Sequence, residues 1–133
     1  MSFDVSEKAV DFALQSASED LLFEFQGGEP LANFNTLKHI VEYTNEKNKE
    51  LNKRITFNLV SNLILLNEDM IKFLVDNNVV ISTSIDGPEM VHNSNRILKK
   101  GNCLDTVKKN MLKLRNYSRI HLIAISAKFI KEY

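Results

Sequence analysis

The sequence predicts an α/β protein built around a parallel sheet. Helix-like and strand-like segments alternate along the chain in the order αβαβαβαβ, and the strand-like segments are short and mostly apolar. Most of them are followed by a turn rich in small or polar residues. Strands that alternate with helices in this way form βαβ units, in an open sheet or in part of a barrel.

The first half of the chain contains the first three of these elements. A helix is predicted at residues 5–17, where apolar residues recur at helical spacing, and Asp4 and Glu7 have the spacing of a capping box at its start. Residues 21–25 form an apolar and aromatic run that predicts a buried strand. A second helix is predicted at residues 34–51, again from helical spacing of apolar residues.

The middle of the chain adds two strands and a helix. Residues 55–60 predict the second strand, and Asn67 then begins a third helix because its side chain can cap the free N–H groups of the first turn. Asn77 and Asn78 end this helix, since asparagine tolerates the left-handed backbone of a helix C-terminus. Residues 79–85 are rich in β-branched side chains and predict the third strand.

The last third of the chain completes the pattern. Residues 89–101 are polar, and we expect a loop there with one turn of helix. A fourth helix at residues 104–114 and a fourth strand at residues 120–125 follow. Because no linker or repeat interrupts the chain, residues 1–133 are expected to form one domain. A helix that opens a βαβ series is unusual, so one strand is expected to be missing in front.

The composition excludes several classes of function. The 17 basic and 17 acidic residues give a formal net charge of zero, which argues against a dedicated nucleic-acid or anionic-membrane binder. The chain has one cysteine, Cys103, so it cannot form an internal disulfide or hold an iron–sulfur cluster on cysteines of its own. No run approaches the roughly 20 apolar residues of a membrane span. A cytoplasmic location is therefore expected.

Polar side chains follow each of the first three predicted strands. In parallel α/β sheets, ligands bind at the carboxyl ends of the strands. That edge is expected to collect six polar residues: Gln26, Glu29, Ser61, Asn62, Ser84 and Asp86. Gly27 and Gly28 allow close approach of a ligand, and the adjacent Glu29 is suited to hold an ammonium group. The alternative is an ordinary strand-to-helix turn with a solvated glutamate.

Two segments resemble motifs of a known family. Residues 25–31 (FQGGEPL) resemble the GGEP segment of radical S-adenosylmethionine enzymes. Residues 82–88 (STSIDGP), followed by His92 and Arg96, resemble the S-[IL]-D-G-P…H-[DN]-x-x-R block of the branch that modifies peptides and matures anaerobic sulfatases. The resemblance covers nearly the whole chain. It implies a partial (β/α) barrel that binds S-adenosylmethionine at the carboxyl ends of the strands.

The resemblance also implies roles for single residues. The Glu29 carboxylate, with the backbone of Gly27 and Gly28, would meet the methionine ammonium, while Gln26 and Ser84 would make polar contacts to the cofactor. The implied cofactor-binding residues are Gln26, Gly27, Gly28, Glu29, Pro30, Asn62 and Ser84.

Three residues of the resemblance have less definite roles. Asn62 would lie near the cofactor ribose. Asp86 and Arg96 match the family pattern without an assigned contact. Arg96 could bind a ligand carboxylate or, as readily, pair with Asp86 or a loop carbonyl.

The sequence departs from the family pattern at two places. The family's CxxxCxxC segment, whose thiolates hold a [4Fe–4S] cluster, is absent, and Cys103 lies in a different loop, where a buried or incidental thiol is expected. Ser61, Asn62 and Leu63 stand where relatives often have threonine, asparagine and glycine. Leucine disfavours a left-handed turn, so the resemblance does not define the detailed geometry of this loop.

These observations predict a truncated piece of a radical S-adenosylmethionine peptide-modifying oxidoreductase, with a peptide or protein substrate and no activity by itself. Without cluster ligands, this chain is expected to bind S-adenosylmethionine weakly or not at all. It is also expected to self-associate through the exposed strands at residues 21–25 and 120–125. One alternative is a cluster-free module that binds a peptide or partner, and another is a plain α/β domain without retained function.

Overall fold

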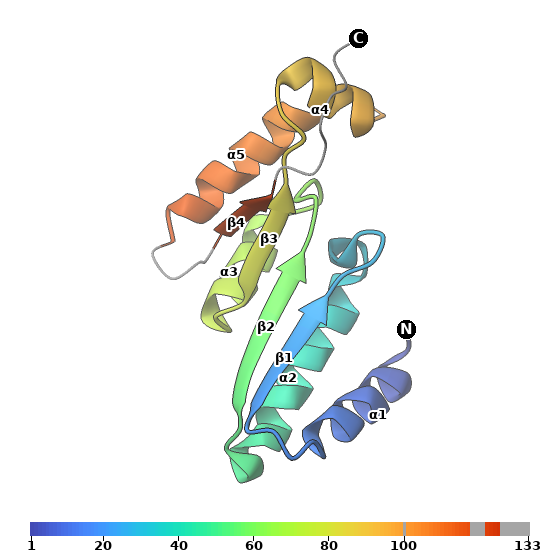
Figure 1. The fold of residues 1–133 in the computed structure, drawn as a ribbon, viewed down its shortest axis with the longest axis vertical. Helices are drawn as coiled ribbons and strands as arrows, with labels where there is room; N and C mark the ends of the chain where they lie inside the picture. Colours follow the sequence, from blue (N-terminus) through green and yellow to red (C-terminus); the bar gives the residue numbers. More distant parts are fainter. Residues whose placement is uncertain (100, 118–121, 126–133) are drawn as a thin grey trace.

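The computed structural model describes residues 1–99, 101–117 and 122–125 (Figure 1). Helices and strands alternate along most of the chain. In chain order the elements are α1 (Phe3–Leu14), β1 (Asp20–Phe25), the 3-10 helix η1 (Pro30–Asn33), α2 (Phe34–Leu51), β2 (Arg54–Val60), α3 (Glu68–Asp76), β3 (Val80–Ser84), α4 (Glu89–Asn95), α5 (Cys103–Arg115) and β4 (Leu122–Ile125). The α/β class and the parallel-stranded architecture are therefore confirmed.

The four strands form one parallel sheet in the order β1-β2-β3-β4. In Figure 1, α2 and α3 lie behind the strands, and α1 packs against α2. Phe23 and Phe25 of β1 point to this covered face and pack against the core, whereas Leu22 between them is 62% exposed. The core lies between the sheet and the helices, where Leu59 and Ile81 are fully buried. The opposite face of the sheet is left open by the described helices.

Several predicted helix ends agree with the structure. The Asn67 side chain accepts a hydrogen bond from the Met70 N–H at 2.9 Å and caps α3 as expected. Asn78 follows the end of α3 with a φ of 52°, the left-handed conformation that asparagine tolerates. Residues 118–121, which include the predicted start of the last strand, lie outside the described residues.

The predicted capping box at the first helix is wrong. Ser2 caps α1 instead, because its side chain accepts from the Val5 N–H at 3.4 Å, and the helix ends at Leu14. Glu7 does not reach back to the helix start, since its Oε1 lies 2.8 Å from Nε2 of His39 on α2. A tertiary contact thus takes the side chain that the local pattern had assigned to capping.

The expected loop at residues 89–101 contains more helix than predicted. α4 spans Glu89–Asn95, and the carbonyl oxygen of Pro88 accepts hydrogen bonds from the N–H groups of Val91 and His92. The His92 side chain is fully buried, which anchors this polar helix to the rest of the domain. Among the described residues, no helix combines the length and apolar character needed to cross a bilayer.

Candidate functional site

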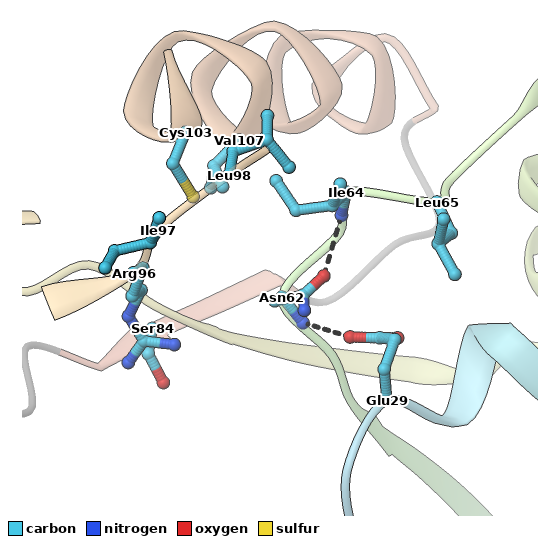
Figure 2. A pocket seen from close by; sticks show the side chains of 10 residues that line it. All are labelled: Glu29, Asn62, Ile64, Leu65, Ser84, Arg96, Ile97, Leu98, Cys103 and Val107. Carbon is cyan, nitrogen blue, oxygen red and sulfur yellow. Dashed lines mark hydrogen bonds between the residues drawn. The ribbon is translucent and has the colours of Figure 1, made fainter. Parts of the chain in front are cut away.

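A cavity of about 430 Å³ lies at the carboxyl ends of β1, β2 and β3 (Figure 2). Ten residues line it: Glu29, Asn62, Ile64, Leu65, Ser84, Arg96, Ile97, Leu98, Cys103 and Val107. Figure 2 shows Glu29 on one side of the cavity, Ser84 and Arg96 on the other, and Asn62 between them. Three of the predicted site residues are therefore brought together: Glu29 from the loop after β1, Asn62 from the loop after β2 and Ser84 from the end of β3.

Glu29 is held in place by the protein. Its Oε1 accepts hydrogen bonds from the Leu31 N–H at 3.0 Å and from the Ser61 hydroxyl at 2.7 Å, and its Oε2 accepts from the Asn62 N–H at 2.9 Å. These bonds join the loop after β1 to the loop after β2. A carboxylate has about four lone-pair positions, so Oε2 keeps room for a further donor. The carboxylate is thus oriented by the fold and is not a freely solvated side chain.

The remaining residues of the GGEP segment lie apart from this cavity. Gln26 and Pro30 line a second hollow of about 220 Å³, on the α2 side of the loop. Gly27 has a φ of 138°, which favours glycine because a Cβ would be strained there, whereas Gly28 has no such requirement. Both glycines are exposed. Their predicted contacts to the cofactor stay predictions.

The loop after β2 contains the left-handed leucine that its sequence disfavours. Leu63 has a φ of 61° and is fully buried. The Ser61 hydroxyl oxygen accepts from the Leu63 N–H at 3.0 Å, and Nδ2 of Asn110 on α5 donates to the Leu63 carbonyl at 2.7 Å. Burial of the side chain and these bonds offset the backbone strain of about 1–2 kcal/mol.

Arg96 pairs with Asp86 in the loop after β3. Its Nε donates to Oδ2 at 2.8 Å and its Nη2 to Oδ1 at 3.0 Å, so the expected alternative that Arg96 pairs with Asp86 is observed. The hydrogen bond from Arg96 holds the pKa of Asp86 below its usual value. Nδ1 of His92 accepts from the Asp86 N–H at 3.2 Å, and burial lowers the pKa of this histidine. The pair and the histidine together fix the loop against α4.

Cys103 lies at the start of α5 and is 5% exposed, as expected for a buried thiol. Burial raises its pKa, which disfavours the thiolate that binds metals. Within residues 1–99, 101–117 and 122–125, no three His, Cys, Asp or Glu side chains gather in a way that could hold a metal ion. One thiol does not match a [4Fe–4S] cluster held by three thiolates.

Sequence reasoning missed the apolar wall of the cavity. Ile64, Leu65, Ile97 and Val107 supply most of this wall, and Ile97 is 86% exposed. The available signal was the apolar pair at residues 97–98 within an otherwise polar segment. The cavity therefore offers an oriented carboxylate on one side and an apolar surface on the other, an arrangement suited to a ligand with a cationic and an apolar part.

Three relatives of known sequence are similar to this chain. An uncharacterised protein of Methanocaldococcus jannaschii is 32% identical over 89% of this chain. A cysteine-type anaerobic sulfatase-maturating enzyme of Clostridium perfringens is 37% identical over 72% of it, and the radical SAM cyclopropyl synthase TigE of Paramaledivibacter caminithermalis is 27% identical over 65%. The matches span 40%, 26% and 18% of these relatives, so the chain corresponds to less than half of each. No protein-family model matches the chain.

A solved structure has the same fold. The native anSMEcpe structure with bound AdoMet and Kp18Cys peptide superposes with a TM-score of 0.83 and 30% sequence identity. The match covers 93% of this chain and 34% of the other. AdoMet is the abbreviated name of S-adenosylmethionine. The fold and the sequence thus point to the same group of enzymes.

Proposed function

Because this chain belongs to the radical S-adenosylmethionine superfamily, as a homologue of one part of the anaerobic sulfatase-maturating enzymes, we propose that its cavity binds S-adenosylmethionine. Residues 1–133 then form a partial core domain of a peptide-modifying enzyme. The observation that carries this proposal is the Glu29 carboxylate, oriented by the Ser61 hydroxyl and the Asn62 N–H at the carboxyl ends of parallel strands. The AdoMet bound in the solved neighbour supports it.

The cavity residues fit the chemical groups of this cofactor. The free acceptor position of Glu29 suits the methionine ammonium, and the exposed backbone at Gly27 and Gly28 can approach the same group. Ser84 supplies a further polar contact, and Asn62 takes the ribose, whereas Gln26 lines the separate hollow and stays a predicted contact. The apolar wall around Ile64 and Ile97 suits the face of the adenine ring.

The cluster of the family does not fit the residues of this chain. In these enzymes the cofactor and the cluster together would supply radical chemistry. The role of this chain is therefore to bind and orient the cofactor. Three charge-assisted hydrogen bonds give at most about 9 kcal/mol, against roughly 4–15 kcal/mol lost on association. Binding by this chain alone is accordingly weak.

The solved neighbours support a class of substrate. The solved structure with 30% identity contains a bound peptide, which supports a peptide or protein substrate for the enzyme of which this chain is a part. The parent activity is an oxidative or cross-linking modification of a side chain. No nucleic-acid contact is expected, since the charges of the chain cancel.

An NMR titration of the full chain tests the cofactor site. S-adenosylmethionine should shift the amide signals of Asn62, Ser84 and Ile97 saturably, with a dissociation constant weaker than micromolar. Methylthioadenosine lacks the ammonium and should bind about tenfold more weakly, which corresponds to one charge-assisted hydrogen bond. Ser84→Ala should weaken binding, whereas Ser94→Ala, a change of an exposed serine on α4, should not.

The outcomes distinguish where the cofactor binds from how tightly it binds. No saturable shift at the cavity at millimolar cofactor would overturn the site. A micromolar dissociation constant by calorimetry would leave the site in place and overturn the expectation of weak binding.

A further inference from the structure

A row of hydrogen-bonded polar side chains runs across three strands of the sheet, from Ser82, which is buried, to Glu24, which is exposed. The Ser82 hydroxyl on β3 donates to Oδ1 of Asn58 on β2 at 3.1 Å, and Nδ2 of Asn58 donates to Oε2 of Glu24 on β1 at 2.8 Å. Glu24 and Asn58 are direct partners in the parallel register. The row therefore spans three adjacent strands, on the face that the described helices leave uncovered (Figure 1).

The row presents one carboxylate oxygen in a fixed position. Because the Ser82 hydroxyl donates to Oδ1 of Asn58, the amide of Asn58 turns its nitrogen toward Glu24. Oε2 of Glu24 is occupied by this bond, and no partner of Oε1 is found among the described residues. The protein thus supplies an oriented acceptor at an exposed position, which favours a hydrogen-bond donor from outside.

The negative charge of Glu24 is not neutralised by any described side chain. Two rungs away, Arg54 of β2 pairs with Asp20 of β1, with its Nη2 at 2.7 Å from Oδ2, so these two charges cancel. Glu24 forms no ion pair with any described side chain. Leu22, between the two rungs on the same face, is 62% exposed and offers an apolar surface. A side chain with an apolar stem and a cationic end matches this pair of surfaces.

The row lies close to the cofactor cavity. Ser82 and Ser84 point to the same face of β3 because side chains alternate along a strand, and two residues span about 6.6 Å. Ser84 lines the cavity. The β3 end of the row is therefore next to the cavity, and Glu24 at its β1 end lies two strands away across the sheet, about 10 Å. A peptide that spans this distance could contact both Glu24 and a ligand of the cavity.

We propose that the row of Glu24, Asn58 and Ser82 binds the basic side chain of a peptide substrate, with its stem on Leu22 and its cationic group on the Glu24 carboxylate. This inference rests on the peptide substrate of the proposed function and adds the residue class that the peptide must carry. Asn58 and Ser82 act as positioning residues, since they orient the carboxylate that makes the contact.

Peptides that differ in one side chain test the proposal on the full chain. Acetylated and amidated pentapeptides with a central lysine, arginine or norleucine, flanked by glycines, are titrated while the amide signals of Glu24 and Asn58 are followed by NMR. Lysine and arginine peptides should bind about tenfold more tightly than the norleucine peptide, as expected for one charge-assisted contact. The preference should shrink as salt screens the charge.

Three variants test which side chains cause the preference for basic peptides. Glu24→Gln keeps the size of the side chain and should abolish the preference for basic peptides. Glu42→Gln changes an exposed acid on the helical side, which pairs with Lys38, and should leave the preference intact. Ser82→Ala should reduce the preference without abolishing it, which distinguishes a positioning role from a merely structural one. Circular dichroism verifies that each variant is folded.

The results also separate this inference from the cofactor site. Equal binding of lysine and norleucine peptides, no binding of either, or a preference that survives Glu24→Gln would overturn the inference. Glu24→Gln should leave the cofactor-induced shifts at Ser84 unchanged, so failure of one proposal does not imply failure of the other. Basic-peptide binding without any cofactor binding would support the row and favour the alternative of a cluster-free peptide-binding module.

Discussion

Arg96 holds Asp86 through two parallel hydrogen bonds, Nε to Oδ2 at 2.8 Å and Nη2 to Oδ1 at 3.0 Å, across the loop that follows β3. The Asp86 side chain is 5% exposed and that of Arg96 is 31% exposed. The pair therefore joins the loop after β3 to the C-terminal end of α4, and residues 97–98 that follow Arg96 form part of the cavity wall. The pair acts together with the hydrogen bond from the Asp86 N–H to Nδ1 of His92, which ties the same loop to α4.

Replacing Arg96 by methionine should lower the free energy of unfolding by about 2–3 kcal/mol, since a buried carboxylate loses its partner. Urea denaturation measures the loss. Arg54→Met is the matched control, because it breaks the exposed pair with Asp20 and should change stability much less. Equal losses in the two variants would contradict the structural role of the Arg96 pair.

The stability of the protein should fall as the pH falls from neutral, because His92 is buried as a neutral ring. Its burial, with Arg96 and Lys108 nearby, lowers its pKa from the ordinary 6.5, and the opposing effect of Asp86 is smaller. The unfolded chain then binds the proton more readily, so stability is present above 6.5 and is lost as the pH falls through the lowered pKa.

His92→Asn tests this dependence, since its side-chain oxygen can replace Nδ1 as acceptor. The variant should lack the part of the slope that begins near pH 6.5 and continues toward lower pH, which one proton limits to about 1.4 kcal/mol per pH unit. The lowered pKa of Asp86 acts in a separate window, below 3.8. If the free energy of unfolding changed equally with pH in the two proteins between pH 7 and 5, His92 would not be buried as a neutral ring.

At Leu63, substitution by glycine should destabilise the protein less than substitution by alanine. It is fully buried with a φ of 61°, so Leu63→Ala loses packing and keeps the backbone strain, whereas Leu63→Gly loses packing and releases it. The glycine variant should be more stable than the alanine variant by about 1 kcal/mol, although both are less stable than the original chain. Urea denaturation of the three proteins measures the order. A more stable alanine variant would show that the turn is relaxed.

The outer edge of β1 should cause self-association. β1 is the first strand of the described sheet, and its outer edge pairs with no described strand. Unpaired strand edges recruit other extended segments, so dimers or larger species are expected at concentrations on the order of tens of micromolar. Leu22→Lys on β1 should reduce association, while Leu112→Lys, an equally exposed leucine on α5, should not. A monomer in sedimentation at these concentrations would contradict the prediction.

Local sequence patterns predicted most of the elements because the signals are local. Helical spacing of apolar residues located α2 and α5, and Asn67 and Asn78 predicted both ends of α3. The pattern failed where a distant partner competed for a side chain. Glu7 had capping-box spacing, but His39, 32 residues away, binds it.

The candidate site was only partly accessible to such reasoning. The strand ends predicted that Glu29, Asn62 and Ser84 would meet, because parallel strands place their carboxyl ends at one edge. The same rule could not show that Gln26 and Pro30 turn to a separate hollow, since that depends on the path of the η1 turn.

The sequence alone determined the class of fold, the order of its elements, the family resemblance and the lack of cluster ligands among its residues, since each depends on residue type and spacing. Only the tertiary structure decided which side chains meet. Arg96 pairs with Asp86, and Glu29 joins Ser61 and Asn62, because packing of the strands brings these groups within hydrogen-bond distance. A pattern along the chain carries no such distance.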